Sequence, residues 1–238
     1  NILRLSGAVL FGGMLAPVML LMGLKLASAA SVSLWLPLEL VATAVLGRMI
    51  FRDYLGLFGW MGLTGVLAAS ILLTFGEGIS GISAGLLIVL ACLCWGIDNN
   101  LTALIDGITP AQITFWKGLT AGITNLSIGL LTQDFQAAVY LLVAALGIGI
   151  FSYGTSIVLY ITAAQNIGAA RGQMFFASSP FFGAVLSYLF LGETVTATQL
   201  VAVLILIGSL VLVFKDRHEH YHLHAEIEHE HSHGHNDK

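Results

Sequence analysis

Three charged side chains lie within long apolar stretches of the sequence: Glu39, Asp98 and Lys117. A charge at the centre of a lipid bilayer costs about 2.5–3.5 kcal/mol on insertion scales, so such residues face protein or water. If these stretches are helical, small and hydroxyl residues share a face with Asp98 and with Lys117. The pattern favours a polar cavity; the alternative is an ion pair that only fixes helix packing.

Asp98 and Lys117 are expected to form an ion pair inside the membrane. Asp98 is six residues before Leu104, where its predicted helix ends, and Lys117 is seven residues after Pro110, where the next helix begins. At 1.5 Å per residue, both side chains lie about 9–10 Å below the same surface. The short turn at 105–109 makes the two helices neighbours, so the charges can meet.

Glu39 lies near the middle of its stretch, with Trp35 and Thr43 on the same helical face. Its carboxyl group could carry a coupling proton, bind a substrate amine, or form a structural hydrogen bond to another helix. The candidate residues of the substrate pathway are Trp35, Glu39, Trp95, Asp98, Asn99, Thr114, Lys117, Thr124, Gln173 and Pro180.

Three prolines lie within predicted helices: Pro17, Pro37 and Pro180. A proline inside a helix frees the carbonyl group four residues earlier. In lipid, a freed carbonyl must be satisfied by protein or by a water-lined path. The prolines therefore favour a solute path, with simple kinks for packing as the alternative.

Gly118 and Gly122 have the G-x-x-x-G spacing that lets two membrane helices approach closely. We expect them to pack within the bundle rather than to dimerise the chain, although a homodimer stays open.

The C-terminal segment contains all eight histidines of the chain. Neutral imidazole nitrogens are ligands that Zn, Ni and Co accept. The expected metal ligands are His218, His220, His222, His224, His229, His231, His233 and His235. The membrane part has no histidine, so we expect metal on the tail but no cofactor required for the main function.

The segments that position these residues are apolar helices. The chain is 57% hydrophobic and 9% charged, with a mean hydropathy of +0.91, which is typical of a membrane protein. A membrane-spanning helix needs about 20 apolar residues. We expect an all-α bundle of eight spans, at 5–27, 31–50, 56–76, 82–104, 110–131, 137–162, 172–191 and 196–214.

The positions of Lys and Arg predict the orientation. With the tail in the cytoplasm, six basic residues face inward and only Lys25 faces outward, which fits the positive-inside rule. The inward residues are Arg4, Arg48, Arg52, Arg171, Lys215 and Arg217. A multi-pass protein of the cell (inner or plasma) membrane with a cytoplasmic tail is expected.

Enzyme and nucleic-acid functions are not favoured. Gly81-Ile-Ser-Ala-Gly85 matches G-x-S-x-G, but a nucleophile elbow follows a strand and needs a histidine partner. No glycine loop that would cradle a nucleotide occurs in the sequence, and no basic groove suggests nucleic acid. The expected partners are a small-molecule solute, the lipid bilayer and a divalent metal on the tail.

Residues 24–75 resemble residues 167–214, with Pro37 aligned to Pro180 and Phe51 to Phe190. Each unit has a small-residue loop, a helix with a central proline, a charged turn and a final helix. An odd number of spans separates the two units, so they run in opposite directions. This inverted repeat is typical of secondary transporters.

The segment from Ala163 to Val213 resembles the end of an EamA-type carrier of the drug/metabolite transporter superfamily. The matching pieces are Ala169-Ala170, Pro180, Leu191-Gly192-Glu193 and Gly208, and the sequence Cys94-Trp95-Gly96-Ile97-Asp98-Asn99 resembles the Trp-Gly-x-x-Asn element that opens each family repeat. The resemblance covers residues 5–214.

This resemblance implies ten helices in two inverted five-helix repeats, so this chain would lack the first two. Residues 1–78 would then be a truncated first repeat, 79–214 a complete second repeat and 215–238 a disordered tail. In the first repeat, Phe51-Arg52-Asp53-Tyr54 replaces Phe190-Leu191-Gly192-Glu193, so the turn glutamate is absent there. The implied function is secondary-active transport of a small organic solute by alternating access; the alternatives are a divalent metal-ion transporter and a membrane metal sensor.

We expect a peptide of residues 215–238 to bind Zn²⁺ or Ni²⁺ near neutral pH and to release it on acidification. Protonation of an imidazole removes the lone pair that binds the metal. Calorimetry across a pH series measures this directly, with a peptide whose eight histidines are replaced by asparagine as the control. Binding that does not weaken on acidification would contradict imidazole ligation.

Overall fold

The computed structural model describes residues 1–51, 55–132 and 138–216, and these residues form helices joined by short turns, with no strand among them. The helices in chain order are α1 (Ile2–Ala8), the π-helix η1 (Val9–Leu15), α2 (Ala16–Leu24), α3 (Ala29–Trp35), α4 (Leu38–Phe51), α5 (Leu57–Gly76), α6 (Gly78–Ala103), α7 (Pro110–Thr132), α8 (Val139–Ile148), the π-helix η2 (Gly149–Thr155), α9 (Ser156–Ile167), α10 (Ala169–Phe176), α11 (Ser179–Leu191) and α12 (Ala197–Lys215). The predicted all-α membrane bundle is confirmed.

Seven helical segments among the described residues, two of them with a short internal interruption, are long and apolar enough to cross a membrane. The segments are Ile2–Leu24, Ala29–Ile50, Leu57–Gly76, Gly78–Ala103, Val139–Ile167, Ala169–Leu191 and Ala197–Lys215. The eighth predicted span corresponds to α7, which is 23 residues long and contains the buried Lys117. The helix after Glu77 starts four residues earlier than predicted, because Gly78 takes a positive φ of 73° and reverses the chain at once.

Two of the predicted proline-containing helices are broken rather than kinked. The chain leaves the helix at Leu36–Pro37, between α3 and α4, and again at Ala177–Ser178, between α10 and α11. Proline cannot donate the backbone hydrogen bond and clashes with the preceding turn, so each helix restarts within one residue of its proline, at Leu38 and at Ser179. Pro17 follows η1, where the first span is wound as a π-helix.

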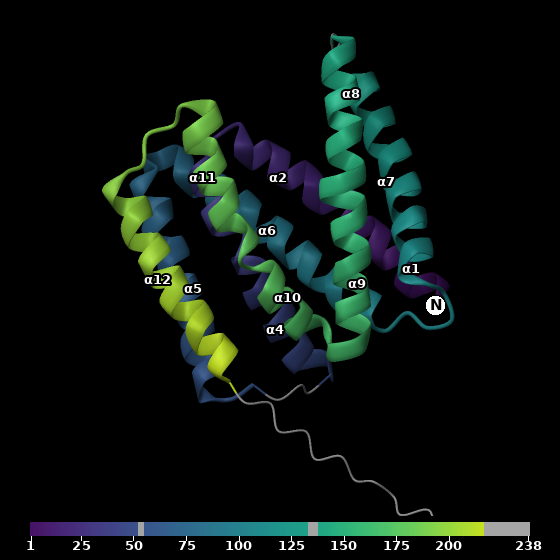
Figure 1. Cartoon of the computed structure of the whole chain (residues 1–238), viewed down its shortest axis with the longest axis horizontal. Helices are drawn as coiled ribbons and strands as arrows, with labels where there is room; N and C mark the ends of the chain where they lie inside the picture. The colour runs from purple at the N-terminus through teal and green to yellow at the C-terminus, as the bar shows by residue number, and fades with distance from the viewer. Residues whose placement is uncertain (52–54, 133–137, 217–238) are drawn as a thin grey trace, which may run out of the picture.

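Helices α5 and α12 run side by side along one flank of the molecule (Figure 1). Glycine makes this contact close: a Cβ atom at Gly62 would lie 2.6 Å from the backbone oxygen of Ser209, and one at Gly65 would lie 2.1 Å from its hydroxyl oxygen. Small residues at such interfaces let membrane helices gain van der Waals contact. The final helices of the two similar segments therefore pack on each other.

The expected packing role of Gly118 and Gly122 is wrong for this bundle. A Cβ atom at either position would meet no described atom within 4 Å. The side of α7 that packs carries Ala121, which a Cβ atom at Gly13 of η1 would approach to 2.7 Å. The spacing identified a pair of glycines but could not show which face of the helix is covered.

Glu193, in the turn before α12, caps the N-terminus of α3. Its carboxylate accepts hydrogen bonds from the backbone N–H groups of Ala29 and Ala30 at 2.8 and 2.9 Å. Free N–H groups and the helix dipole at an N-terminus favour a negative charge. The turn of the second segment is thereby fixed to the first segment.

Glu77 joins the same contact from the turn between α5 and α6. It accepts hydrogen bonds from the hydroxyl groups of Ser28, at 2.8 Å, and Ser31. The side-chain amide of Gln199 donates to Ser31 at 3.0 Å. We call Ser28, Ser31, Glu77, Glu193 and Gln199 the glutamate cluster.

The opposite ends of the helices are joined by a second set of polar contacts. Arg4 donates to the backbone oxygen of Leu104, and Gln165 donates to that of Ile105 at 2.9 Å. The backbone N–H of Gly56 donates to the Asp216 carboxylate at 2.8 Å. The turns that follow α4, α6, α9 and α12 therefore lie on the side opposite the glutamate cluster.

We expect impermeant thiol reagents to label Ser80→Cys and Thr194→Cys from outside intact cells, and Asp106→Cys and Asn166→Cys only after permeabilisation. All four positions are exposed, and the first two lie beside the glutamate cluster. The background thiols Cys92 and Cys94, both buried, are replaced by alanine first. Gel-shift counting of labelled protein reads the result, and labelling of all four positions from one side would contradict the topology.

Candidate functional site

A cavity of about 200 Å³ lies inside the bundle at the level of the two helix breaks. Its wall combines α4, α6 and α7 with η2, α9, α10 and α11. Leu36 comes from the first break and Ala177 from the second. Both helix breaks therefore border the cavity.

The predicted ion pair between Asp98 and Lys117 is confirmed. The Lys117 Nζ atom is 2.7 Å from both carboxylate oxygens of Asp98, and the Thr102 hydroxyl group donates to Asp98 at 2.8 Å. Both charged residues are about 95% buried, with 5% and 6% of their surface exposed. Gly12 makes room for the pair, because a Cβ atom there would lie 1.9 Å from an Asp98 oxygen.

A short turn between α6 and α7 lets the two charges meet. Helix α6 ends at Ala103, and Gly107, with a φ of 76°, allows the turn. Thr109 and Gln112 then bond reciprocally around Pro110, with the Thr109 N–H donating to Gln112 at 2.9 Å, so that α7 starts with a capped first turn.

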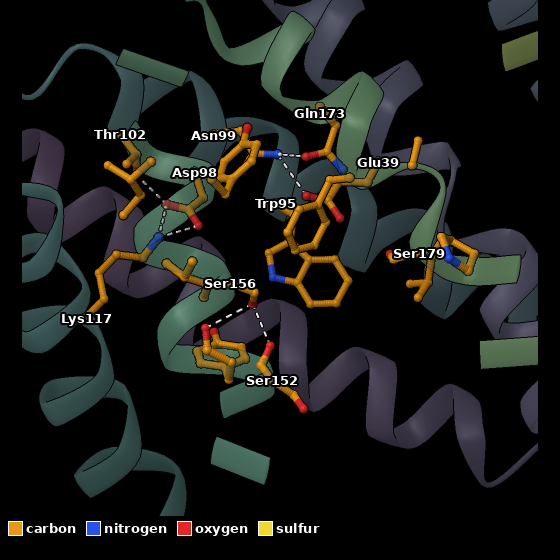
Figure 2. Close-up of a pocket in the computed structure, with 18 residues that line it drawn as sticks. Glu39, Trp95, Asp98, Asn99, Thr102, Lys117, Ser152, Ser156, Gln173 and Ser179 are labelled. Atoms are coloured by element: carbon orange, nitrogen blue, oxygen red, sulfur yellow. Dashed lines mark hydrogen bonds and ion pairs between the residues drawn. The ribbon is translucent and has the colours of Figure 1, made fainter. Parts of the chain in front are cut away.

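Glu39 is joined to Asn99, which lies beside Asp98 on α6 (Figure 2). The Asn99 amide group donates to the Glu39 carboxylate at 2.8 Å, to the Thr43 hydroxyl group at 3.0 Å and to the Gln173 side-chain oxygen at 3.5 Å. Asn99, Thr43 and Gln173 are buried, whereas Glu39 is partly exposed. One amide thus connects α4, α6 and α10.

The Trp-Gly-x-x-Asn element of α6 has a contact for each of its named residues. The Trp95 indole N–H donates to the Gly12 carbonyl of η1 at 3.1 Å. A Cβ atom at Gly96 would lie 2.9 Å from the backbone of Ala42, so glycine permits the close approach of α4. With Asn99 bonded to Glu39, this element joins α6 to η1 and to α4.

Hydroxyl and aromatic side chains complete the wall opposite α6. The π-helix η2 and the start of α9 contribute Ser152, Tyr153 and Ser156. Tyr160 and Phe176 pack edge to face, with ring centroids 5.6 Å apart. Single π-helical turns inside α-helices are rare and frequently occur at functional sites.

Most of the predicted pathway residues line this cavity. They are Glu39, Trp95, Asp98, Asn99, Lys117, Gln173 and Pro180. Three others do not: the hydroxyl groups of Thr114 and Thr124 bond to their own helix at Pro110 and Thr120, and Trp35 is fully buried and donates to the Ser70 carbonyl at 3.0 Å. The break at Leu36–Pro37 removes Trp35 from the face of Glu39.

Sequence reasoning missed the contribution of η2 and α9. Ser152 and Ser156 are four residues apart and therefore share a helical face. The sequence thus contained a polar face within the predicted span 137–162. This face carries no charged residue, and hydroxyl groups alone do not mark a membrane helix as functional. For Tyr160 and Phe176, the sequence does not distinguish a side chain that lines a cavity from one that is packed in the core.

The predicted histidine ligands lie at 218–235, outside the described residues. Within the part of the chain that the structure describes, no three His, Cys, Asp or Glu side chains gather closely enough to hold a metal ion. The metal site of the tail therefore stays a prediction.

The comparisons with known proteins point to a transporter. The model of the EamA-like transporter family matches residues 82–215. An uncharacterized transporter of Methanothermobacter thermautotrophicus is 26% identical over 200 residues, which cover 80% of this chain and 58% of that protein. The chain thus spans little more than half the length of this relative.

We expect Lys117→Met and Asp98→Asn each to destabilise the protein, because either change leaves the other charge buried without its partner, at a cost of about 3–5 kcal/mol. The double variant should lose less than the sum of the two. Thermal unfolding in detergent, followed by size-exclusion chromatography, measures the three midpoints. Fully additive losses, or a silent Lys117→Met, would contradict an energetic role for the pair.

Proposed function

We propose that this chain, which belongs to the EamA-like transporter family, is a secondary-active carrier of a small organic solute. The observation that carries the proposal is the cavity at the two helix breaks, where charged, amide, hydroxyl and aromatic groups converge inside a membrane bundle. Such groups are costly in lipid and are retained where a solute needs them.

Helices from both of the similar segments of the chain line the cavity, as expected for a site between two repeats. Glu39 belongs to α4 and Gln173 to α10, and each is bonded to Asn99 of α6. A solute that exchanged hydrogen bonds with this amide would act on three helices at once. Binding could therefore change the balance between two arrangements of the bundle.

We assign the two arrangements to alternating access in an inverted repeat. The pairs α3/α4 and α10/α11 are both broken near a proline, and α5 and α12 follow them and pack together. On this assignment residues 1–78 contribute the first repeat and 79–214 the second. Rocking of one repeat against the other would expose the cavity to each side in turn.

The location of the carrier and the role of its tail are also part of the proposal. The carrier is proposed to lie in the cell membrane, with the segment 215–238 in the cytoplasm as an accessory metal-binding tail. No catalytic step is needed, because transport requires only binding and a change in exposure.

We expect Ser156→Phe to lower solute flux in proteoliposomes by about tenfold or more, equivalent to ~1.4 kcal/mol in the barrier. The phenyl ring would fill the cavity, while the Ser156 hydroxyl group bonds only to its own helix, at Ser152 and Tyr153. Ser127→Phe is the matched control: its hydroxyl group also bonds to its own helix, at 2.7 Å to Ile123, but it is exposed on the outside of α7.

The assay uses counterflow with labelled amino acids, nucleosides, sugars and divalent metals, and includes a variant ending at residue 216. Flux of an organic solute that survives removal of the tail supports the proposal. If only metal ions move and the shortened chain is inactive, the tail is part of the mechanism and the organic-solute assignment is wrong.

A further inference from the structure

The charges around the cavity do not balance when Glu39 is ionised. Lys117 lies 2.7 Å from Asp98 and is thereby paired. Glu39 adds a further carboxyl group, and the ion pairs found among the described residues, Arg4 with Asp106 and Lys117 with Asp98, do not include it. An ionised carboxylate inside a membrane bundle needs a positive partner, which this wall does not supply.

We infer that the solute is a small organic cation, such as a protonated amine, whose charged group binds the carboxylate of Glu39. This inference rests on the proposed function, because it names the class of solute that the same cavity carries. The partly exposed Glu39 faces the cavity, whereas the Asp98–Lys117 pair is almost completely buried. The carboxylate that is open to a ligand is therefore the one that forms no ion pair among the described residues.

The hydrogen bonds around Glu39 prepare it for an N–H donor. Asn99 donates to one carboxylate oxygen at 2.8 Å, and this hydrogen bond orients the group beside the side chain of Gln173. The Gln173 oxygen, 3.5 Å from the same amide, is only weakly engaged and points to the same place. An ammonium group has three donors, and these two oxygens could accept two of them.

The rest of the wall suits an organic cation better than a metal ion. Ca²⁺ takes six to eight oxygen ligands and Mg²⁺ about six. Here the carboxylate of Glu39 and the side-chain oxygen of Gln173 are accompanied by the aromatic rings of Trp95, Tyr153 and Phe176. Aromatic faces attract ammonium groups and pack against an apolar body.

An anionic solute is disfavoured by the same geometry. The ammonium group of Lys117, the one cation among the cavity-lining residues that the structure describes, is held by Asp98 through both oxygens. To bind an anion it would have to leave a buried carboxylate without a partner, which is costly.

The test compares three compounds that share a phenyl ring and differ in charge: phenethylamine, phenylalanine and phenylacetate. Their binding to the purified full-length protein in detergent is measured by isothermal calorimetry at neutral pH. We expect phenethylamine to bind at least about tenfold more tightly than the other two, since tenfold is the effect of a single modest interaction. Glu39→Gln, which keeps the shape of the side chain, should abolish this preference.

Asp106→Asn is the control for removal of an acidic group, because Asp106 lies in the exposed turn between α6 and α7, away from the cavity. It should leave the binding of phenethylamine unchanged. Size-exclusion profiles and melting midpoints of Glu39→Gln must match those of the parent protein; if this variant fails to fold, Glu39→Asp replaces it and should weaken binding without abolishing the preference.

Equal binding of the three compounds, retention of the preference by Glu39→Gln, or no binding of phenethylamine up to about 10 mM would overturn the inference. Retention of the preference by Glu39→Gln would show that the Glu39 carboxylate does not hold the charged group of the ligand. Because binding is measured without flux, a carrier of some other solute would still pass the Ser156→Phe test while failing this one.

Discussion

The cost of a charge in lipid is the constraint on which the centre of this bundle depends. Lys117 and Asp98 would each be expensive alone, and together they require that α6 and α7 meet at one depth with almost no solvent between them. Gly12 is part of the same requirement, since a larger residue there would collide with the carboxylate. The first span therefore packs closely against the ion pair, and the ion pair forms part of the cavity wall.

The backbone of that first span illustrates how the second cost, an unpaired carbonyl group in lipid, is met. The Gly12 carbonyl accepts from Trp95 and the Gly13 carbonyl from Asn125, at 3.1 and 2.9 Å. The π-helical winding and Pro17 disturb the normal ladder of hydrogen bonds, and side chains from neighbouring helices replace what is lost. The helix can thus be irregular at membrane depth because its irregular part is covered by protein.

Features that depend on helical periodicity and on distance from the membrane surface could be predicted from the sequence. Features that depend on contacts between distant segments could not. The helical spans and the Asp98–Lys117 pair follow from segment length and from equal distances to one surface. Trp35 was misplaced because a proline can kink a helix or break it, and only the break takes that side chain off the face of Glu39. Glu193 could be read as a family motif, but its bond to the start of α3, 163 and 164 residues away, has no local signal.

The contacts between the two similar segments also bear on how such a bundle could change shape. On one side they depend on Glu193 with the N-terminus of α3 and on Gln199 with Ser31; on the other, Asp216 binds the N–H of Gly56. A typical hydrogen bond contributes only about 0.5–1.5 kcal/mol net, because water can replace the partner when the contact opens. When apolar packing such as that between α5 and α12 is separated, water cannot replace the lost van der Waals contacts. Under the proposed alternating access, the polar contacts at the two ends would open and close in turn at little net cost, while the glycine-mediated packing of α5 on α12 would stay closed.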